Sequence, residues 1–423
     1  MIASYVGTVR RFSRDLRLYL ASSALYGFAV DGIRAVLFNL YLLRLGYGPR
    51  QIGLINAMTV VVFTVACFPV GTWSKRWGSR RTLMLGMAFV VAGCALPPLA
   101  ELVPLRWRVG WLACTNAFGG LGAAFSWVSG IPFLMAAAGP EARDHAFAAY
   151  AAVGPLSAFL GSLLGGALPG ALAPLLGVTL DAPGAYRDAL WIPVVVGSVA
   201  ILLLRAMREV NIGRVAERAA DMRPAPSGLI AAVALIAVFR YAGNGAVVTF
   251  TNVYLDAGLG TSTILIGALI AAGKLLSVPA GLATPLLVVR WGRGRTVILG
   301  SLFLALATLP LALVPHWAAV GLGYIGVTTL FTITTTALRV YSQELVSPAW
   351  RSTMSAALMA GAGSSASAIA FGGGYLIPAL GYSGLFLIGA TLTAIGAAVF
   401  WGVFRVPRGE LARQAGAGAG LGD

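Results

Sequence analysis

Charged residues are scarce in this sequence of 423 residues: Asp, Glu, Lys and Arg together account for 10% of it, whereas hydrophobic residues account for 58%. Soluble domains typically carry about 25% charged residues, which cover the surface that faces water. This chain has too little charge for such a surface. The composition therefore excludes an ordinary soluble protein and indicates that lipid is its main solvent.

The residues that usually build redox, metal and catalytic sites are also rare. The three cysteines, Cys67, Cys94 and Cys114, lie in apolar runs, and neither His145 nor His316 belongs to a cluster with metal-ligand spacing. No glycine-rich phosphate loop precedes a Lys-Ser or Lys-Thr pair. These absences argue against a disulfide framework, a metal centre and ATP hydrolysis by this chain alone. Because acids are sparse in the apolar runs, we expect no enzyme and no cofactor.

Twelve apolar runs are long enough to cross a membrane, which takes about 20 residues in a helix. They cover residues 16–43, 52–73, 82–104, 109–138, 146–172, 189–206, 228–255, 264–289, 296–314, 318–341, 353–380 and 384–404. Because backbone N–H and C=O groups in lipid must be paired within the segment, we expect every run to be an α-helix. The sequence therefore predicts an all-α integral membrane protein with 12 transmembrane helices.

Basic residues indicate how these runs are oriented. If the N-terminus lies in the cytoplasm, 22 of the 30 Lys and Arg residues fall on the cytoplasmic side, five on the other side, and Arg34, Arg240 and Lys274 within spans. Cytoplasmic loops of membrane proteins carry such an excess. This distribution, rather than nucleic-acid binding, explains the net charge of +16. We expect a multi-pass protein of a bacterial inner (plasma) membrane with both termini in the cytoplasm.

The two halves of the chain carry the same short patterns in the same order. The matching pairs are Asn39-Leu-Tyr-Leu with Asn252-Val-Tyr-Leu, Ile52-Gly with Ile266-Gly, Arg76-Trp-Gly-x-x-Arg-Thr with Arg290-Trp-Gly-x-x-Arg-Thr, and Pro140-x-x-Arg with Pro348-x-x-Arg. A parallel repeat of six spans predicts two pseudo-symmetric six-helix bundles with a central cavity. We expect an N-terminal bundle at 1–207, a cytoplasmic linker at 208–227, a C-terminal bundle at 228–405 and a cytoplasmic tail at 406–423.

The span pattern and the loop after the second span resemble the major facilitator superfamily (MFS). The family's loop motif usually reads Gly-x-x-x-Asp-Arg-x-Gly-Arg-Arg/Lys, and here it runs from Gly71 to Arg81. Lys75 stands where the family has Asp, an acid that takes part in a charge latch holding one conformation. The resemblance implies a conformational role for the motif residues of both halves, namely Gly71, Lys75, Arg76, Gly78, Arg80, Arg81, Arg290, Gly292 and Arg295.

Two further segments are similar to motifs of the family's proton antiporters. Gly120-Leu-Gly-Ala-Ala in the fourth span matches the end of one motif, with Asn116 where the family has Arg. Gly154-Pro155 in the fifth span matches the start of Gly-Pro-x-x-Gly-Gly, with Ala158-Phe159 in place of the two glycines. The resemblance implies export of small molecules driven by proton entry.

Asp31 lies near the middle of the first span, and Arg34 follows it on the same helical face. A charge at that depth costs about 3 kcal/mol on insertion scales, so it usually faces a wet cavity or a partner. Two interpretations are open. Asp31 is a protonatable switch between access states, tuned by Arg34, or the two residues form a permanent ion pair that braces the span. The repeat places Asn244 opposite Asp31, and an amide cannot titrate.

Arg240 and Lys274 lie in the middle of spans in the second half. With Arg34 they make three cations against one anion at that depth, and a bound anionic group would balance the excess. The alternative is that they snorkel or pair elsewhere, just as Trp127 could contact substrate or anchor a helix. The predicted substrate-binding or gating residues are Arg240, Lys274, Asn244, Asn116 and Trp127.

These features predict a secondary transporter that works by alternating access. We expect a monomer that couples proton entry to export of a small amphipathic or drug-like molecule, with membrane lipids as its other partner. One alternative is proton-linked uptake or flipping of an anionic solute or lipid, which the excess of cations favours. Another is a non-transporting membrane receptor or scaffold, which the replacement of the motif acid by Lys75 favours.

Overall fold

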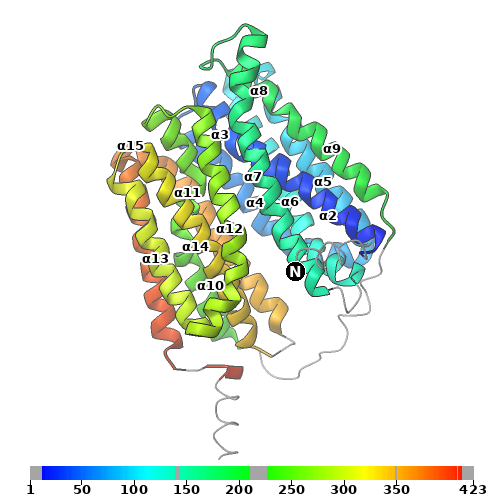
Figure 1. The fold of residues 1–423 in the computed structure, drawn as a ribbon, viewed down its shortest axis with the longest axis vertical. Helices are drawn as coiled ribbons and strands as arrows, with labels where there is room; N and C mark the ends of the chain where they lie inside the picture. The colour runs from blue at the N-terminus through cyan, green and yellow to red at the C-terminus, as the bar shows by residue number, and fades with distance from the viewer. Residues whose placement is uncertain (1–11, 139–142, 210–225, 348–349, 407, 412–423) are drawn as a thin grey trace, which may run out of the picture. The chain divides into compact units, whose positions relative to one another are not determined.

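The computed structural model describes residues 12–138, 143–209, 226–347, 350–406 and 408–411, except for the side chains of Thr72, Lys75 and Asp144. These residues form helices and no β-strand (Figure 1). The first half contains α2 (Arg14–Tyr26), η1 (Gly27–Arg34), α3 (Ala35–Arg44), α4 (Pro49–Trp77), α5 (Ser79–Ala95), η2 (Pro97–Leu102), α6 (Leu105–Ala137), α7 (Arg143–Leu176), α8 (Pro183–Ala189) and α9 (Trp191–Arg205). The second half contains α10 (Ser227–Arg240), α11 (Ala242–Val253), η4 (Tyr254–Gly258), α12 (Thr263–Trp291), α13 (Arg293–Leu313), α14 (Trp317–Glu344) and α15 (Arg351–Phe404).

Apolar helices account for the twelve predicted spans. Ten helical stretches of the described chain are long and apolar enough to cross a membrane. One of them, α15, has 54 residues and is interrupted at Gly381, whose φ of 71° lies outside the helical region, so it supplies two spans. Helix α5, which has 17 residues, completes the set. The prediction of an all-α membrane protein with twelve membrane helices is confirmed.

The chain divides into two compact units that do not coincide with the two halves of the sequence. Unit 1 contains the described residues of Met1–Arg214 together with Thr249–Val278, and unit 2 contains those of Val215–Val248 and Pro279–Asp423. The last part of α11, η4 and the first half of α12 therefore pack with the first half of the chain. The predicted linker at 208–227 and tail at 406–423 lie mostly outside the described residues.

The first span changes to a π-helix, η1, at the point where it packs against α7. A Cβ atom on Gly32 of η1 would lie only 2.6 Å from the Cα atom of Gly161, and one on Gly27 would lie 2.7 Å from the carbonyl oxygen of Gly154. Small residues let helix backbones approach this closely in membranes. Single π-helical turns are rare and are often found at functional sites. This close packing holds Asp31, which lies in η1 between the two glycines.

A polar cluster joins the end of α3 to the segment around η4 within unit 1. Arg44 donates two hydrogen bonds to Asp256, from Nη1 to Oδ2 at 2.6 Å and from Nη2 to Oδ1 at 2.7 Å. The ring of Tyr186 lies 5.1 Å from the guanidinium carbon. One turn deeper, the Asn39 amide donates to Oδ1 of Asn252 at 3.3 Å. Forked Arg–carboxylate pairs are among the stronger polar contacts, so this cluster fixes η4 against the first span.

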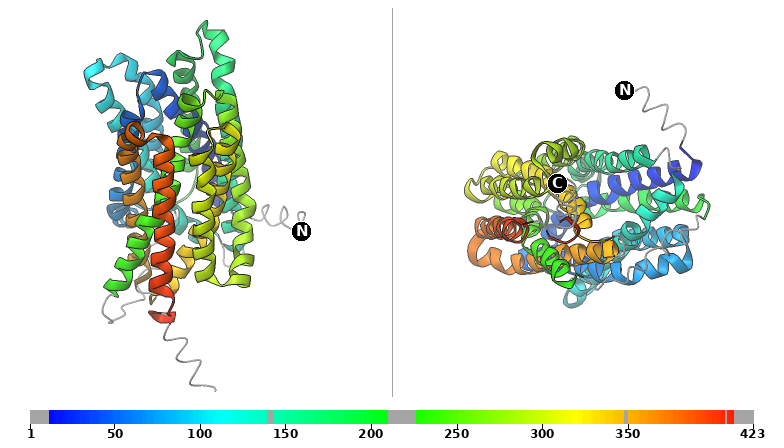
Figure 2. Two further views of the ribbon diagram at one scale, coloured as in Figure 1. Left: turned by 90° about the vertical axis from the view of Figure 1, so that its left-hand side faces the viewer. Right: turned by 90° about the horizontal axis from the view of Figure 1, so that it is seen from below.

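Unit 2 packs around α10 and the two parts of α15. Figure 2 shows α10 beside the C-terminal part of α15, drawn in red. At their contact a Cβ atom on Gly396 would lie 2.8 Å from the backbone nitrogen of Arg240. A cluster of buried apolar side chains in this unit includes Tyr341 and Phe400, whose ring centroids are 5.3 Å apart. This packing places the end of α10 in the interior of the unit.

Breaking the Arg44–Asp256 pair should destabilise the protein. Arg44→Ala leaves the carboxylate of Asp256, whose side chain is 8% exposed, without its partner, and loss of one member of a buried pair costs about 3 kcal/mol. We expect Arg44→Ala and Asp256→Ala to lower the melting temperature of the purified protein in detergent.

Arg187→Ala is the matched control. Arg187 pairs with Glu101 and Asp188, but its side chain is 37% exposed, and exposed pairs contribute about 0–1 kcal/mol. Equal losses in Arg44→Ala and Arg187→Ala would contradict the importance of the forked pair. A double variant with the charges exchanged, Arg44→Asp with Asp256→Arg, should recover part of the lost stability.

Candidate functional site

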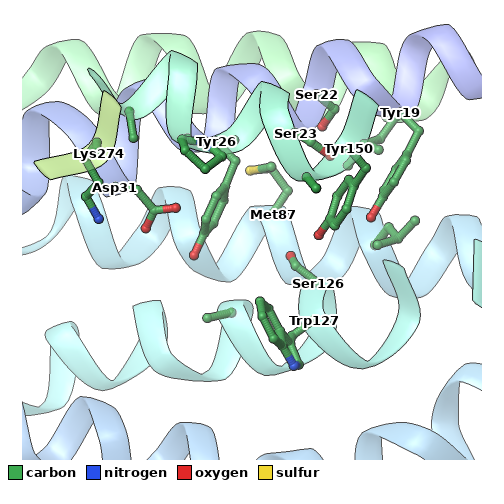
Figure 3. A pocket seen from close by; sticks show the side chains of 18 of the residues that line it. Tyr19, Ser22, Ser23, Tyr26, Asp31, Met87, Ser126, Trp127, Tyr150 and Lys274 are labelled. Atoms are coloured by element: carbon green, nitrogen blue, oxygen red, sulfur yellow. The ribbon is translucent and has the colours of Figure 1, made fainter. Parts of the chain in front are cut away.

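A cavity of about 410 Å³ lies inside unit 1, between helices of the first half and the first half of α12 (Figure 3). Its lining residues come from α2, η1, α4, α5, α6, α7, α9 and α12. The volume falls within the usual range of pockets for small molecules, about 300–1,000 Å³. We therefore take this cavity as the candidate functional site of unit 1.

Aromatic side chains form much of the cavity wall. Tyr19 and Tyr26 follow one another along α2, and Tyr150 of α7 stacks on Tyr19 with ring centroids 5.8 Å apart and planes 13° apart. Trp127 of α6 is 44% exposed and lines the wall near Ser126 (Figure 3). The prediction that Trp127 contacts substrate is consistent with this position. The tyrosines were not predicted, although Tyr19 and Tyr26 are seven residues apart and therefore share one face of the helix.

Asp31 supplies the negative charge of the cavity. Figure 3 shows its carboxylate and the Lys274 ammonium group at the same end of the cavity. Lys274 and Arg34 are the cations whose charges act on Asp31. Among the described residues, Asp31 makes no hydrogen bond and no ion pair within 4.0 Å. The site thus contains an unpaired carboxylate with a lysine nearby, in a mostly apolar wall.

Arg34 hydrogen-bonds Asn116 and forms no ion pair with Asp31. Its Nη2 donates to Oδ1 of Asn116, and its guanidinium carbon lies 4.6 Å from the ring centroid of Phe38. The amide nitrogen of Asn116 in turn donates to the carbonyl oxygen of Ile55 at 3.2 Å. The structure therefore does not contain the permanent Asp31–Arg34 ion pair that was one interpretation of the sequence. It brings together two predicted site residues, Arg34 and Asn116, from the first and fourth spans.

Arg240 and Asn244 belong to unit 2 and are described there separately. The side chain of Arg240 is fully buried, its Nη2 donates to Oγ1 of Thr335 at 3.2 Å, and its guanidinium carbon lies 5.0 Å from the ring of Tyr241. Asn244 follows one turn later in α11, and its Oδ1 is buried without a hydrogen-bond partner. Thus Lys274 is placed with Asp31, whereas Arg240 and Asn244 form a second polar region.

The two repeated loops adopt the same backbone turn. Gly78, between α4 and α5, has φ 85° and ψ 155°, and Gly292, between α12 and α13, has φ 79° and ψ 154°. Positive φ values of this kind favour glycine, which explains the glycine in both motifs. The remaining charged motif residues lie next to these turns in α4, α5, α12 and α13: Arg76, Arg80, Arg81, Arg290 and Arg295. Gly71 lies in α4, and the side chain of Lys75 is outside the described part of the structure.

An acid from outside the motif contacts the first loop. Glu209, at the start of the predicted linker, accepts a hydrogen bond from the backbone N–H of Arg80 at 3.2 Å. The Arg80 side chain donates to the carbonyl oxygen of Arg205 at 2.6 Å. Glu209 thus places a carboxylate at the N-terminus of α5, where a negative charge is favourable. Sequence reasoning missed this residue because it is far from the motif along the chain.

The fold and the loops agree with comparisons to known proteins. The sequence matches the family model described as Major Facilitator Superfamily over residues 19–371. No curated protein sequence is similar enough to this chain to count as a match.

Solved structures share the fold at low sequence identity. A crystal structure of a mutant of the nucleoside transporter NupG has a TM-score of 0.74 at 12% identity, over 92% of this chain and 100% of that one. The inward-open xylose transporter XylE from E. coli has a TM-score of 0.73 at 14% identity, over 95% of this chain and 98% of that one. A bacterial homologue of the human lysosomal transporter Spinster has a TM-score of 0.66 at 16% identity, over 92% of this chain and 96% of that one.

The family match covers most of the chain, and solved transporter structures share its fold over 92% and 95% of its length. This protein belongs to the major facilitator superfamily and is a multi-pass membrane transporter of a small molecule rather than an enzyme.

Proposed function

We propose that this transporter exports small amphipathic molecules in exchange for protons and that its cargo binds in the cavity of unit 1. The observation that carries the proposal is the unpaired Asp31 carboxylate in the wall of that cavity. Apolar surroundings disfavour the charged form of a carboxyl group unless a partner stabilises that form. Proton binding and release at Asp31 therefore change the free energy of any state in which the cavity opens to water.

The wall of the cavity supports an amphipathic cargo. Tyr19, Tyr26, Tyr150 and Trp127 offer flat apolar faces together with hydroxyl groups and an indole N–H. Such side chains bind molecules that have an apolar body and a few polar groups. Serines of α2, Ser22 and Ser23, add small polar groups beside the rings. This combination favours an amphipathic molecule over a sugar, which would require many more hydrogen-bonding groups.

Alternating access supplies the mechanism of the proposal. Neutral Asp31 favours one access state and charged Asp31 the other, so that proton entry drives cargo exit. The titratable and charged groups facing Asp31 are Tyr26 of α2, Lys274 of α12 and Arg34 of its own span. When Asp31 loses its proton, the nearby Lys274 provides a positive charge that stabilises the carboxylate. We further propose a bacterial inner (plasma) membrane location with both termini in the cytoplasm, which the distribution of basic residues favours.

Replacing Asp31 should uncouple protons from transport. Asp31→Asn keeps the size of the side chain but removes the group that binds the proton. We expect proton movement on addition of cargo to fall to the level of protein-free liposomes. The measurement uses proteoliposomes loaded with a pH-sensitive dye and challenged with cationic, neutral and anionic amphiphiles.

Asp31→Glu is the control for that experiment, because it keeps a carboxylate and should retain part of the proton movement. pH-dependent transport that persists unchanged in Asp31→Asn would overturn the assignment of the proton site. If the wild-type protein binds amphiphiles but moves neither them nor protons, the alternative of a membrane receptor is favoured.

Removing the indole of Trp127 should weaken cargo binding. Trp127→Ala deletes a large apolar surface from the wall, and we expect a loss of about 2 kcal/mol, or about 30-fold in Kd. The measurement is a titration of the purified protein with an amphiphile that the liposome experiment has shown to be transported.

Trp107→Ala offers a matched control on the same helix, α6. Trp107 is 65% exposed and does not line the cavity of unit 1, so its removal should leave the Kd unchanged. Equal effects of the two substitutions would place the cargo outside this cavity.

A further inference from the structure

Arg240 is a fully buried cation whose hydrogen-bonding capacity is largely unused. Its side chain has 0% exposure, and Thr335 occupies only Nη2. Nε and Nη1 have no hydrogen-bond partner among the described residues. These two atoms carry three N–H donors. A guanidinium group stays protonated under all ordinary conditions, so burial cannot be relieved by loss of the charge.

The described part of unit 2 offers no carboxylate to balance this charge. The acids in its described part are Glu344 and Glu410. Glu344 pairs with Arg293 at the start of α13, and the backbone of Glu410 is bound to Leu345 at the end of α14. Both lie at helix ends, whereas Arg240 lies in the middle of the span Ser227–Gly258. A buried charge without a partner is costly, which indicates that Arg240 acquires one in another state of the protein.

The sequence repeat relates Arg240 to the cavity of unit 1. In the register that matches Asn39 with Asn252, Arg240 corresponds to Gly27. In the register that matches Pro140 with Pro348, its partner Thr335 corresponds to Trp127. Gly27 and Trp127 both line the cavity of unit 1. The guanidinium and hydroxyl of unit 2 thus occupy positions whose counterparts form the binding wall of unit 1.

The helix that carries Arg240 continues through Tyr241, the residue between α10 and α11, which has φ −81° and ψ −8°. The N–H of Tyr241 donates to the carbonyl oxygen of Ala237 at 3.0 Å, and its own carbonyl oxygen accepts from the N–H of Gly245 at 2.9 Å. Asn244 therefore lies one turn after Arg240 on the same side of the helix. Asn244 and Thr335 are both partly exposed. The amide nitrogen of Asn244 and the hydroxyl of Thr335 are donors that suit an anion beside Arg240.

We infer that Arg240, with Thr335 and Asn244, binds an anionic group, a carboxylate or a phosphate. Oxygen pairs of these groups match the donors of a guanidinium and form short, charge-assisted hydrogen bonds with it. The inference does not depend on the cargo proposed for the cavity of unit 1. Anion binding itself is tested without transport.

The test measures binding to the purified protein with probes of equal chain length and different charge. Octanoate and octyl phosphate carry the two anionic groups, and octyltrimethylammonium carries a cation. We expect the anions to raise the melting temperature and to bind in titration calorimetry more tightly than the cation. Arg240→Gln should weaken anion binding about 30-fold and Arg240→Lys about tenfold, because lysine keeps the charge but loses the fork.

Arg106→Gln is the matched control, since it also removes one positive charge but lies on an exposed helix end. It should bind the anions as the wild type does. If Arg240→Gln does not fold, Thr335→Val and Asn244→Ala replace it, and each should weaken anion binding severalfold. Equal binding of anions by the wild type and Arg240→Gln, or no preference for anions over the cation, would overturn the inference and leave Arg240 as a structural residue.

Two sources of the anion can be separated in the same preparations. Native mass spectrometry of the protein with phosphatidylglycerol reports a lipid phosphate, whereas calorimetry with octanoate and octyl phosphate reports a free solute. Loss of bound lipid in Arg240→Gln, without competition by octanoate, shows that a lipid phosphate rather than a free acid occupies the anion site. Asp31→Asn should still bind anions, so pH-dependent transport that persists unchanged in this variant, together with intact anion binding, refutes the proposed function alone.

Discussion

A charged side chain inside a membrane needs water or a partner, and this constraint organises the polar interior of the protein. Each mid-span charge meets it differently. Asp31 lines a cavity with Lys274 nearby, and Arg34 binds Asn116. Among the described residues, Arg240 contacts the hydroxyl of Thr335 and the ring of Tyr241. Charged side chains that have a partner or water stabilise one structure. Those that lack some or all of the partners they need are stabilised when they bind a proton or a ligand. The residues proposed to be functional belong to this second group.

Close helix packing places these charges where they are. Glycines let η1 approach α7, and a further glycine lets α15 approach the end of α10. At the first of these contacts the backbone leaves the regular α-helical form, since η1 is π-helical. Irregular backbone in a membrane is tolerated where it is buried in protein or lines a cavity. The small residues therefore determine the shape of the site and the orientation of its charged side chains.

Much of the site was visible in the sequence as residue types, but not as pairs. Their position in the middle of predicted spans, where charged residues are rare, identified the candidate site residues Asp31, Arg34, Lys274 and Arg240. Helical spacing predicted that Arg34 faces Asp31, yet Arg34 binds Asn116 of the fourth span. Spacing describes one helix only, and which of several neighbours a long side chain meets depends on the packing of other helices. The Arg44–Asp256 pair was missed for the same reason.

The sequence by itself determined the membrane environment, the number of spans, the repeated halves and the glycine turns, because each depends on local composition or on one backbone position. The tertiary structure alone decided which residues share the cavity and which charges are paired. It also grouped residues 249–278, which belong to the second half of the repeat, with the first half of the chain. These outcomes depend on contacts between residues far apart in the chain, where the energies of alternative pairings differ too little to be ranked from residue type.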